Sequence, residues 1–341
     1  MKRIFYLDVI RVIACLMIII LHSPMPGDKI IGMFAFGSWF FTMPAIGLFF
    51  AVSGSLLLPN LAPPISFLKK RLLKVVLPTL VWTFVYIMAN GTFMDGDWNQ
   101  IIKSVCSIPF HRQGHGVLWF MYTIIGLYLI TPVISPWLEN VDKKTLQIYL
   151  GIWSVTLFFP ILRQFLEVEE SAFGVLYYFS GFSGYFVFGF YLRKFGFNIK
   201  WWAALVMLGG MMIVPVITKL FLPEFDTTYV YYYLSIVCLI MVALWWNILK
   251  PLGEKLQTRP KVVSVITEIS WMSFGIYLSH ILVMKYFLCH TPLILGIDNY
   301  ILQTFTITLL TVIGATLLTY LIGYLPYGEY IIGYKHGKRR K

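Results

Sequence analysis

Residues 5–22 read FYLDVIRVIACLMIIILH, a run that is apolar except for Asp8, Arg11 and His22. It is nearly as long as the roughly 20 apolar residues that cross a bilayer as a helix. No small-residue cleavage site follows it, so we interpret it as a retained span and not as a cleaved signal peptide. A charge at the bilayer centre costs about 2.5–3.5 kcal/mol on insertion scales. The polar residues inside this span are therefore candidates for chemistry.

The spacing of these polar residues predicts one stripe along the helix. Ten residues separate Arg11 from His22, so the two side chains are about three full turns apart and share a face, about 16 Å apart along the axis. Asp8 lies three residues before Arg11, which is close enough for the two charges to pair. The stripe would carry a carboxylate, a guanidinium and an imidazole through most of a membrane.

The composition of the whole chain is that of a polytopic membrane protein. Of its 341 residues, 59% are hydrophobic and 12% are charged, whereas soluble domains have about 25% charged residues. The formal net charge is +12, but the basic residues are distributed between apolar segments, so we exclude a nucleic-acid partner. The four cysteines show no metal-ligand spacing, and no metal is expected. The sequence leaves open whether Cys106 and Cys289 pair.

Ten segments are apolar and long enough to cross a bilayer. They are 4–23, 33–58, 72–90, 117–137, 145–163, 174–193, 201–221, 229–249, 264–285 and 300–325. With a cytoplasmic N-terminus, most Lys and Arg residues fall in cytoplasmic connections, as the positive-inside rule requires. We therefore predict an all-α integral membrane protein with about ten transmembrane helices, both termini cytoplasmic, and a single domain over residues 1–341.

Basic residues cluster where the third span begins, in the segment SFLKKRLLKVVLP of residues 66–78. Lys70, Arg71 and Lys74 can fall on one side of a helix. Clusters of lysine and arginine bind phosphate groups. Positive residues at this place also hold a loop on the cytoplasmic side, and spacing alone favours this second interpretation.

Further histidines lie toward the outer side of the membrane. Tyr277 and His280 of the ninth span are three residues apart and share a face, and His115 falls in the outer loop before the fourth span. An imidazole can take a proton from a hydroxyl near neutral pH. Taken singly, these histidines are more often found at headgroup level, as amphipathic side chains are. His22 is the stronger candidate because it shares a stripe with Arg11.

Two classes of function fit these features. The first is an enzyme that takes an activated group from a phosphate-bearing donor in the cytoplasm and passes it to an acceptor outside. The second is a polytopic transporter or flippase of a glycan or lipid-linked intermediate, with an embedded charge relay. Only the enzyme would bind and consume a donor. A scaffold without chemistry fits poorly with three polar side chains on one membrane-embedded stripe.

The order of several motifs resembles that of the acyltransferase family 3 membrane proteins, which O-acylate bacterial cell-surface glycans. LDVIRVIACLMIIILH resembles the opening of the family, in which an arginine or lysine precedes a histidine by eleven positions. FLKKRLLKVVLP resembles its basic loop, although Lys74 replaces the usual second arginine and lacks its bidentate fork. FFAVSGSLL, LWFMYTIIGLYLITP, GYFVFGFYL and SFGIYLSHILV resemble other spans of the family.

This resemblance implies a transmembrane acyltransferase that uses cytoplasmic acyl-CoA, usually acetyl-CoA, as co-substrate and holds no tightly bound cofactor. It implies that the nucleotide lies near Arg71, Lys74 and Lys70, and that the pantetheine arm runs past Arg11. The implied location is the bacterial inner membrane. Some members carry an extracytoplasmic hydrolase-like domain after the last span, and we expect none here because the last predicted span ends near Leu325.

The resemblance also implies roles on the acceptor side. His22 would act as general base or as a transient acyl carrier, and the sequence does not separate these roles. Asp8 would hold Arg11. The acceptor would be a cell-envelope or exported glycan, or a lipid-linked sugar. The side chains implied to lie on the acceptor side are His280, Tyr277, Trp119 and His115.

Overall fold

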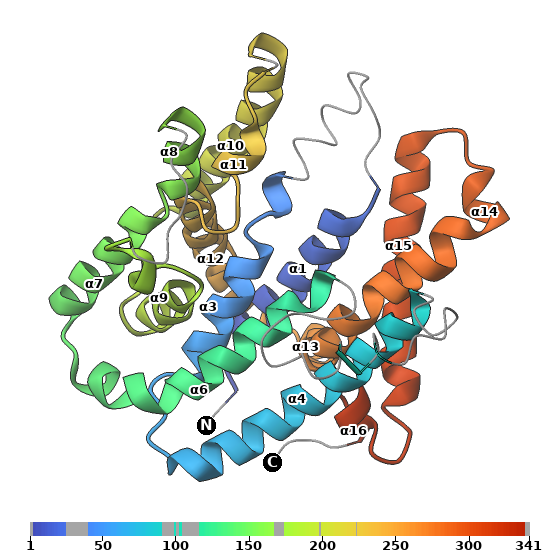
Figure 1. The fold of residues 1–341 in the computed structure, drawn as a ribbon, viewed down its shortest axis with the longest axis horizontal. Coiled ribbons are helices and arrows are strands. Elements are labelled where there is room, and N and C mark those ends of the chain that lie inside the picture. Colours follow the sequence, from blue (N-terminus) through green and yellow to red (C-terminus); the bar gives the residue numbers. More distant parts are fainter. Residues whose placement is uncertain are drawn as a thin grey trace. The chain divides into compact units, whose positions relative to one another are not determined.

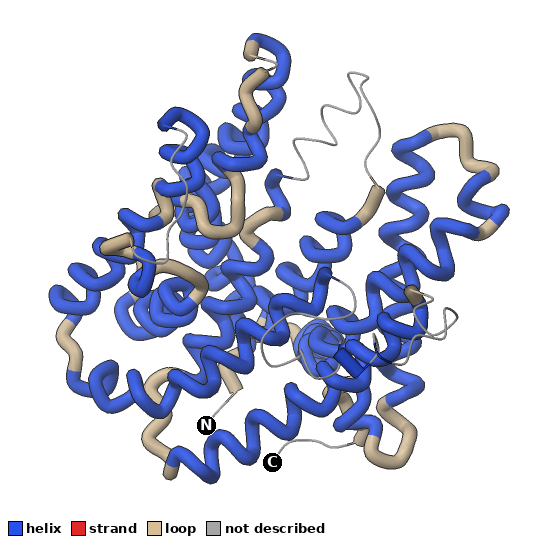
Figure 2. The backbone as a smooth tube through the Cα atoms, viewed as in Figure 1, coloured by secondary structure: helices blue, strands red, loops and turns tan. Residues whose placement is uncertain are grey.

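The computed structural model describes residues 3–24, 40–90, 99, 102–103, 116–166, 174–197, 199–222 and 224–337. Within these residues the secondary structure consists of helices and turns (Figure 2). The longer helices are α1 (Phe5–His22), α3 (Ala45–Leu57), α4 (Pro64–Ala89), α6 (Trp119–Asn140), α7 (Lys143–Thr156), α8 (Phe159–Leu166), α9 (Ser183–Phe195), α10 (Trp201–Phe221), α12 (Ile236–Leu256), α13 (Pro260–Ile281) and α15 (Tyr300–Ile322). The short ones are η1 (Gly116–Leu118), η2 (Tyr177–Phe179), α11 (Thr227–Val230), η3 (Leu282–Phe287), η4 (Leu288–His290), α14 (Pro292–Leu295) and α16 (Gly328–Ile331). The predicted all-α fold is confirmed for the described residues.

Nine helical segments in the described part of the chain are long and apolar enough to cross a membrane. They are Phe5–His22, Phe40–Leu57, Pro64–Ala89, Gly116–Asn140, Lys143–Leu166, Trp201–Phe221, Ile236–Leu256, Pro260–His290 and Tyr300–Ile322. All nine correspond to predicted spans. The polytopic architecture expected from the sequence is therefore present.

The remaining predicted span, 174–193, is shorter than expected. This segment begins with the 3₁₀ turn η2, and α9 starts only after Gly181, whose φ is +93°. Glycine adopts such a backbone conformation readily, and the turn separates η2 from α9. With 13 residues, α9 is about 20 Å long, which is less than the roughly 30 Å of a bilayer core.

The helices form two compact units. Unit 1 contains Met1–Asn60 and Ile134–Ser270, and unit 2 contains Leu61–Val133 and Trp271–Lys341. The chain passes between the units at three points: between Asn60 and Leu61, in the connection from α3 to α4, and then within α6 and within α13. Each unit is therefore built from two separate stretches of sequence.

The short helix α9 is a buried support of unit 1 (Figure 1). A Cβ on Gly54 of α3 would lie 1.7 Å from the carbonyl oxygen of Phe186, and one on Gly189 of α9 would lie 1.8 Å from that of Ala51. The two backbones can approach this closely only with glycine at both positions. Since α1 packs against α3 and α12, the α3–α9 pair holds the first span in place.

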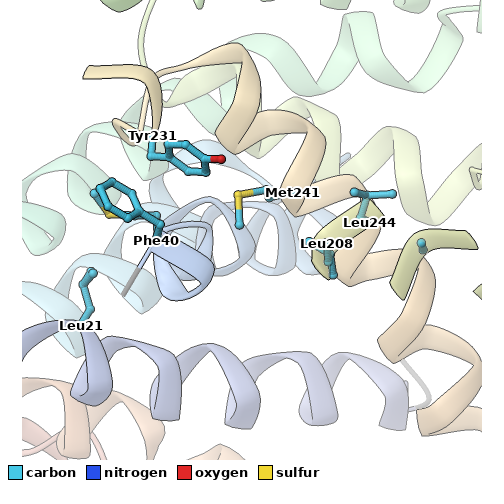
Figure 3. Close-up of a cluster of buried hydrophobic side chains, with 8 residues drawn as sticks. Leu21, Phe40, Leu208, Tyr231, Met241 and Leu244 are labelled. Carbon is cyan, nitrogen blue, oxygen red and sulfur yellow. The ribbon is translucent and has the colours of Figure 1, made fainter. Parts of the chain in front are cut away.

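Apolar side chains pack beside the last turn of α1. Figure 3 shows Leu21 of α1 in a cluster with Phe40, Tyr231 and Met241. The rings of Phe40 and Tyr231 are 4.8 Å apart, and the Tyr231 hydroxyl donates to the carbonyl oxygen of Met211 over 2.6 Å. Because helices in a bilayer associate through close packing and polar contacts, this cluster fixes the end of α1, where His22 follows Leu21.

The segment after α15 packs back onto unit 2. The indole Nε1 of Trp82 in α4 donates to the carbonyl oxygen of Ile331 in α16 over 3.0 Å. A Cβ on Gly275 of α13 would lie 2.5 Å from Thr319 and 2.7 Å from Ile332. The chain beyond the last predicted span is therefore an ordered part of unit 2 as far as the structure describes it.

Candidate functional site

The stripe predicted on the first span lies on one continuous helix. Helix α1 runs from Phe5 to His22, so the helical spacing of Arg11 and His22 applies without a break. Both side chains are half-buried, whereas Asp8 is only 6% exposed. The helix thus places a guanidinium and an imidazole on one face about three turns apart, and each retains partial access.

Asp8 has partners that the sequence analysis missed. Its Oδ2 accepts from Arg3 Nε over 2.6 Å, and its Oδ1 accepts from Arg3 Nη2 over 3.0 Å and from Ser270 Oγ over 2.7 Å. Arg3 also donates to the carbonyl oxygen of Thr267 over 3.3 Å. The buried carboxylate therefore ties the start of α1 to α13 within unit 1. Arg3 is five residues from Asp8, outside the helical spacing of three or four on which the prediction relied.

The ring of His22 is held by its own helix. Its Nδ1 lies 2.8 Å from the carbonyl oxygen of Ile18. A carbonyl oxygen only accepts, so Nδ1 must carry the proton and Nε2 carries the lone pair of the neutral ring. Because His22 is the last residue of α1, it lies where the helix dipole stabilises positive charge. The arrangement suits a side chain that takes up a proton at Nε2.

The residue after His22 completes this helix end. Ser23 is buried, its Oγ donates to the carbonyl oxygen of Ile19 over 2.9 Å, and its backbone N–H bonds to Ile19 and Ile20. The last carbonyl groups of a helix lack partners within it, and here side chains and the cap satisfy several of them. The geometry around the imidazole is therefore fixed by several hydrogen bonds.

The basic residues of α4 divide between two faces. Arg71 and Lys74 are half-buried on the side that carries the buried residues Phe67, Val75 and Pro78. Lys70 is exposed. A cluster that served only to orient a loop would have no need to turn two of its charges inward. The structure thus separates Arg71 and Lys74 from Lys70 within the predicted donor group.

Three of the four predicted acceptor-side residues gather in unit 2. The ring of Tyr277 lies 5.3 Å from Phe120 and 5.6 Å from His280, and Phe120 lies 6.4 Å from Trp119. His280 is fully buried, and its Nδ1 lies 2.6 Å from the carbonyl oxygen of Tyr277.

This cluster also supports the start of α6. The Tyr277 hydroxyl donates to the carbonyl oxygen of Val117, in η1 immediately before α6. Tyr277 therefore holds the turn that precedes Trp119, and His280 packs against the ring of Tyr277. The fourth predicted residue, His115, lies outside the described residues, as does Cys106 of the cysteine pair left open above.

The candidate residues thus form three groups. The α1 stripe belongs to unit 1, and the α4 pair and the cluster around Tyr277 belong to unit 2. Among the residues that the structure describes, no three His, Cys, Asp or Glu side chains gather as a metal site would require. The chemistry available to these groups is acid–base and nucleophilic catalysis at an imidazole and anion binding at paired cations.

Comparison with known protein families separates the two function hypotheses. A family model described as an acyltransferase domain, that of acyltransferase family 3, matches residues 4–325. The match covers every helix from α1 to α15. No curated protein and no solved structure matches the chain. The match supports the enzyme over the transporter, and the apolar helices agree with a membrane location. The chain therefore belongs to acyltransferase family 3 and is a multi-pass membrane acyltransferase.

Proposed function

We propose that this acyltransferase moves an acetyl group from cytoplasmic acetyl-CoA to a hydroxyl of a cell-envelope or exported glycan, in the bacterial inner membrane. The observation that carries this proposal is the ring of His22, whose Nδ1 donates to the carbonyl oxygen of Ile18. This hydrogen bond assigns the lone pair to Nε2. A half-buried imidazole at a helix end, with a fixed tautomer, is suited to accept a hydroxyl proton.

The transfer step follows from this tautomer. The acceptor O–H gives its proton to Nε2 while its oxygen attacks the thioester carbonyl, forming the ester bond. The C–S bond breaks, and the thiolate of CoA takes the proton back from the imidazolium. If His22 instead carries the acyl group, the same Nε2 is the nucleophile. Both routes need a lone pair on this nitrogen, so the hydrogen bond of Nδ1 serves either.

The proposed donor site uses the inward face of α4. The phosphates of CoA would bind to Arg71 and Lys74, arginine through its bidentate fork and lysine as a point charge. The partial burial of both side chains supports this role, because charge-assisted hydrogen bonds are stronger where water is excluded. The pantetheine arm would then extend toward the acetyl-transfer position past Arg11, which lies between the cytoplasmic end of α1 and His22.

The proposed orientation places both termini in the cytoplasm. Positively charged connections support it, and an even number of crossings requires that η2 and α9 together form the tenth. Under this orientation the basic end of α4 faces the cytoplasm, and His22 lies toward the outer side. Donor and acceptor would then approach from opposite sides of the membrane.

The experiment that tests the donor side is a titration of the purified protein with acetyl-CoA. Wild type should bind saturably, and Arg11→Ala and the double variant Arg71→Ala, Lys74→Ala should weaken binding about tenfold or more, the scale of lost charge-assisted hydrogen bonds. The control, Lys143→Ala with Lys144→Ala, removes two exposed charges from another predicted cytoplasmic connection and should bind as wild type. Absence of binding by folded wild type would contradict acetyl-CoA as the donor.

A further inference from the structure

Helix α13 changes its hydrogen-bond pattern immediately after His280. The α-helix ends at Ile281, and the next segment, η3 from Leu282 to Phe287, is a π-helix. Short π-helical segments within longer helices are rare and occur frequently at functional sites. A change of pattern in a helix has an identifiable cause, such as a side chain inserted into the ladder of backbone hydrogen bonds.

Side chains bond to the carbonyl groups of the turn that precedes this change. Ser279 Oγ donates to Gly275 over 2.9 Å, and His280 Nδ1 lies 2.6 Å from the Tyr277 carbonyl oxygen. Both of these side chains belong to α13 itself. The third comes from α4: the Tyr86 hydroxyl donates to the carbonyl oxygen of Leu278 over 2.7 Å.

Tyr86 adds a hydrogen bond from another helix to a carbonyl group in the last α-helical turn of α13. In an uninterrupted α-helix the N–H of Leu282 would donate to the carbonyl oxygen of Leu278, four residues earlier. The Tyr86 hydroxyl donates to the same carbonyl oxygen, which has a second lone pair to accept this bond. Tyr86 is fully buried, so it holds this position without competition from solvent. The hydrogen bond of Tyr86 thus lies at the point where α13 passes into the π-helical segment η3.

We propose that Tyr86 is a positioning residue for acetyl transfer, acting by holding the last α-helical turn of α13, which carries His280, where it meets the π-helical segment η3. This inference rests on the proposed function and on the implied place of Tyr277, His280 and Trp119 on the acceptor side. Tyr277 in turn holds the start of α6 through the carbonyl oxygen of Val117. A change at the Tyr86 hydroxyl would therefore shift the His280 turn and, through Tyr277, the position of Trp119.

The test compares Tyr86→Phe with Tyr185→Phe. Tyr185 is a matched control because it is also fully buried and its hydroxyl donates to a backbone carbonyl, that of Tyr233, over 2.9 Å. Each variant loses one hydroxyl and one hydrogen bond and keeps its ring. Tyr185 belongs to unit 1, whereas the π-helix belongs to unit 2.

Three quantities are measured for each variant. They are the affinity for acetyl-CoA, the transfer of label from radiolabelled acetyl-CoA to the glycan of the cell envelope, and backbone hydrogen exchange of residues 278–287. Tyr86→Phe should transfer about 10–100-fold more slowly, the scale expected when a positioned group moves by about an ångström. Its acetyl-CoA affinity should equal that of wild type, and exchange at Leu282 should change. Tyr185→Phe should match wild type in transfer and in exchange over this segment.

Equal transfer by Tyr86→Phe and Tyr185→Phe would overturn the proposal, since the Tyr86 hydroxyl would then be an ordinary buried anchor. Unchanged exchange at Leu282 in Tyr86→Phe would also overturn it. If wild type transfers no acetyl group at all, the proposed function fails, and the exchange measurement still decides whether Tyr86 holds the π-helix. The two failures are therefore distinguishable.

Discussion

His22 and His280 lie near the ends of α1 and α13 and are held in the same way. In each, Nδ1 is within hydrogen-bond distance of a backbone carbonyl of its own helix, that of Ile18 or that of Tyr277. Both rings therefore have their lone pair on Nε2 when neutral. They differ in access, because His22 is half-buried and His280 is fully buried. Hydrogen bonding fixes the tautomer of both imidazoles, and because His22 is the more accessible of the two, we propose it as the one that meets the substrate.

Replacing His22 by alanine should have the largest effect on activity. Loss of a general base costs about 10²–10⁴-fold in rate, so transfer from labelled acetyl-CoA should fall by that amount. The protein should still insert into the membrane and bind acetyl-CoA as wild type does. Retained transfer by a well-folded His22→Ala protein would remove His22 from the mechanism and with it the distinction between the two histidines.

His280→Ala should have a different effect from His22→Ala. Removing a fully buried side chain leaves a cavity, and comparable core truncations cost about 2–5 kcal/mol. We expect a lower thermal unfolding temperature in detergent, together with a raised KM for the glycan acceptor and unchanged acetyl-CoA affinity. If His280→Ala instead lowered kcat as strongly as His22→Ala with no loss of stability, the buried ring would be a reacting group.

Arg3 and Ser270 both bond to Asp8 at the start of α1, and their contributions to the free energy of unfolding can be measured separately. Arg3→Met removes the cation and two hydrogen bonds of a buried carboxylate and should cost about 3 kcal/mol, whereas Ser270→Ala removes one hydrogen bond to the same carboxylate and should cost about 1.5 kcal/mol, the two ends of the range for hydrogen bonds to charged groups. Denaturation of both variants in detergent measures the difference. A larger cost for Ser270→Ala than for Arg3→Met would show that Asp8 is held mainly by α13.

Replacement of Asp142 should have the smallest effect of these variants. It separates the pH dependence of folding stability from the pH dependence of transfer by His22. Hydrogen bonds from Thr145 and from nearby backbone N–H groups lower the pKa of this carboxyl below its ordinary value of 3.8. A lowered pKa in the folded state contributes stability above the unfolded value, and this stability is lost as the pH falls through the folded pKa. Imidazoles take up their proton at higher pH, between about 8 and 5.

The variant Asp142→Asn keeps a residue that caps helices well but removes this titration. Its unfolding temperature should depend less on pH below about 4 than that of wild type, the region in which free aspartate protonates. Its loss of transfer between about pH 8 and 5, where histidine titrates, should match that of wild type. If the variant changed the profile near neutral pH, the loss of transfer there would reflect the fold and not His22.

The first span could be predicted from the sequence because hydropathy and helical spacing decide it. Helix α1 covers residues 5–22, one residue inside each end of the predicted span 4–23, and the step of three that joins Arg71 to Lys74 places both on one face of α4. The short length of α9 was missed because its composition is that of a span. A hydropathy window does not register a turn at Gly181.

The contacts between distant segments could not be predicted. Ser270 lies far from Asp8 in sequence, and Tyr86 lies far from Leu278. A serine or tyrosine in an apolar segment gives no sign of which carbonyl or carboxylate it meets, because that depends on how the helices pack. The sequence thus identified the candidate reacting side chains but not the groups that hold them.

The most direct test of the account is the tautomer of His22 in the folded protein. Histidine labelled with ¹⁵N distinguishes protonated from unprotonated ring nitrogens, and subtraction of the His22→Ala spectrum assigns this residue among the six histidines. Above the pH at which the ring titrates, we predict a proton on Nδ1 and a lone pair on Nε2. A proton on Nε2 would contradict the account, because the nitrogen proposed to accept the acceptor proton would already be occupied.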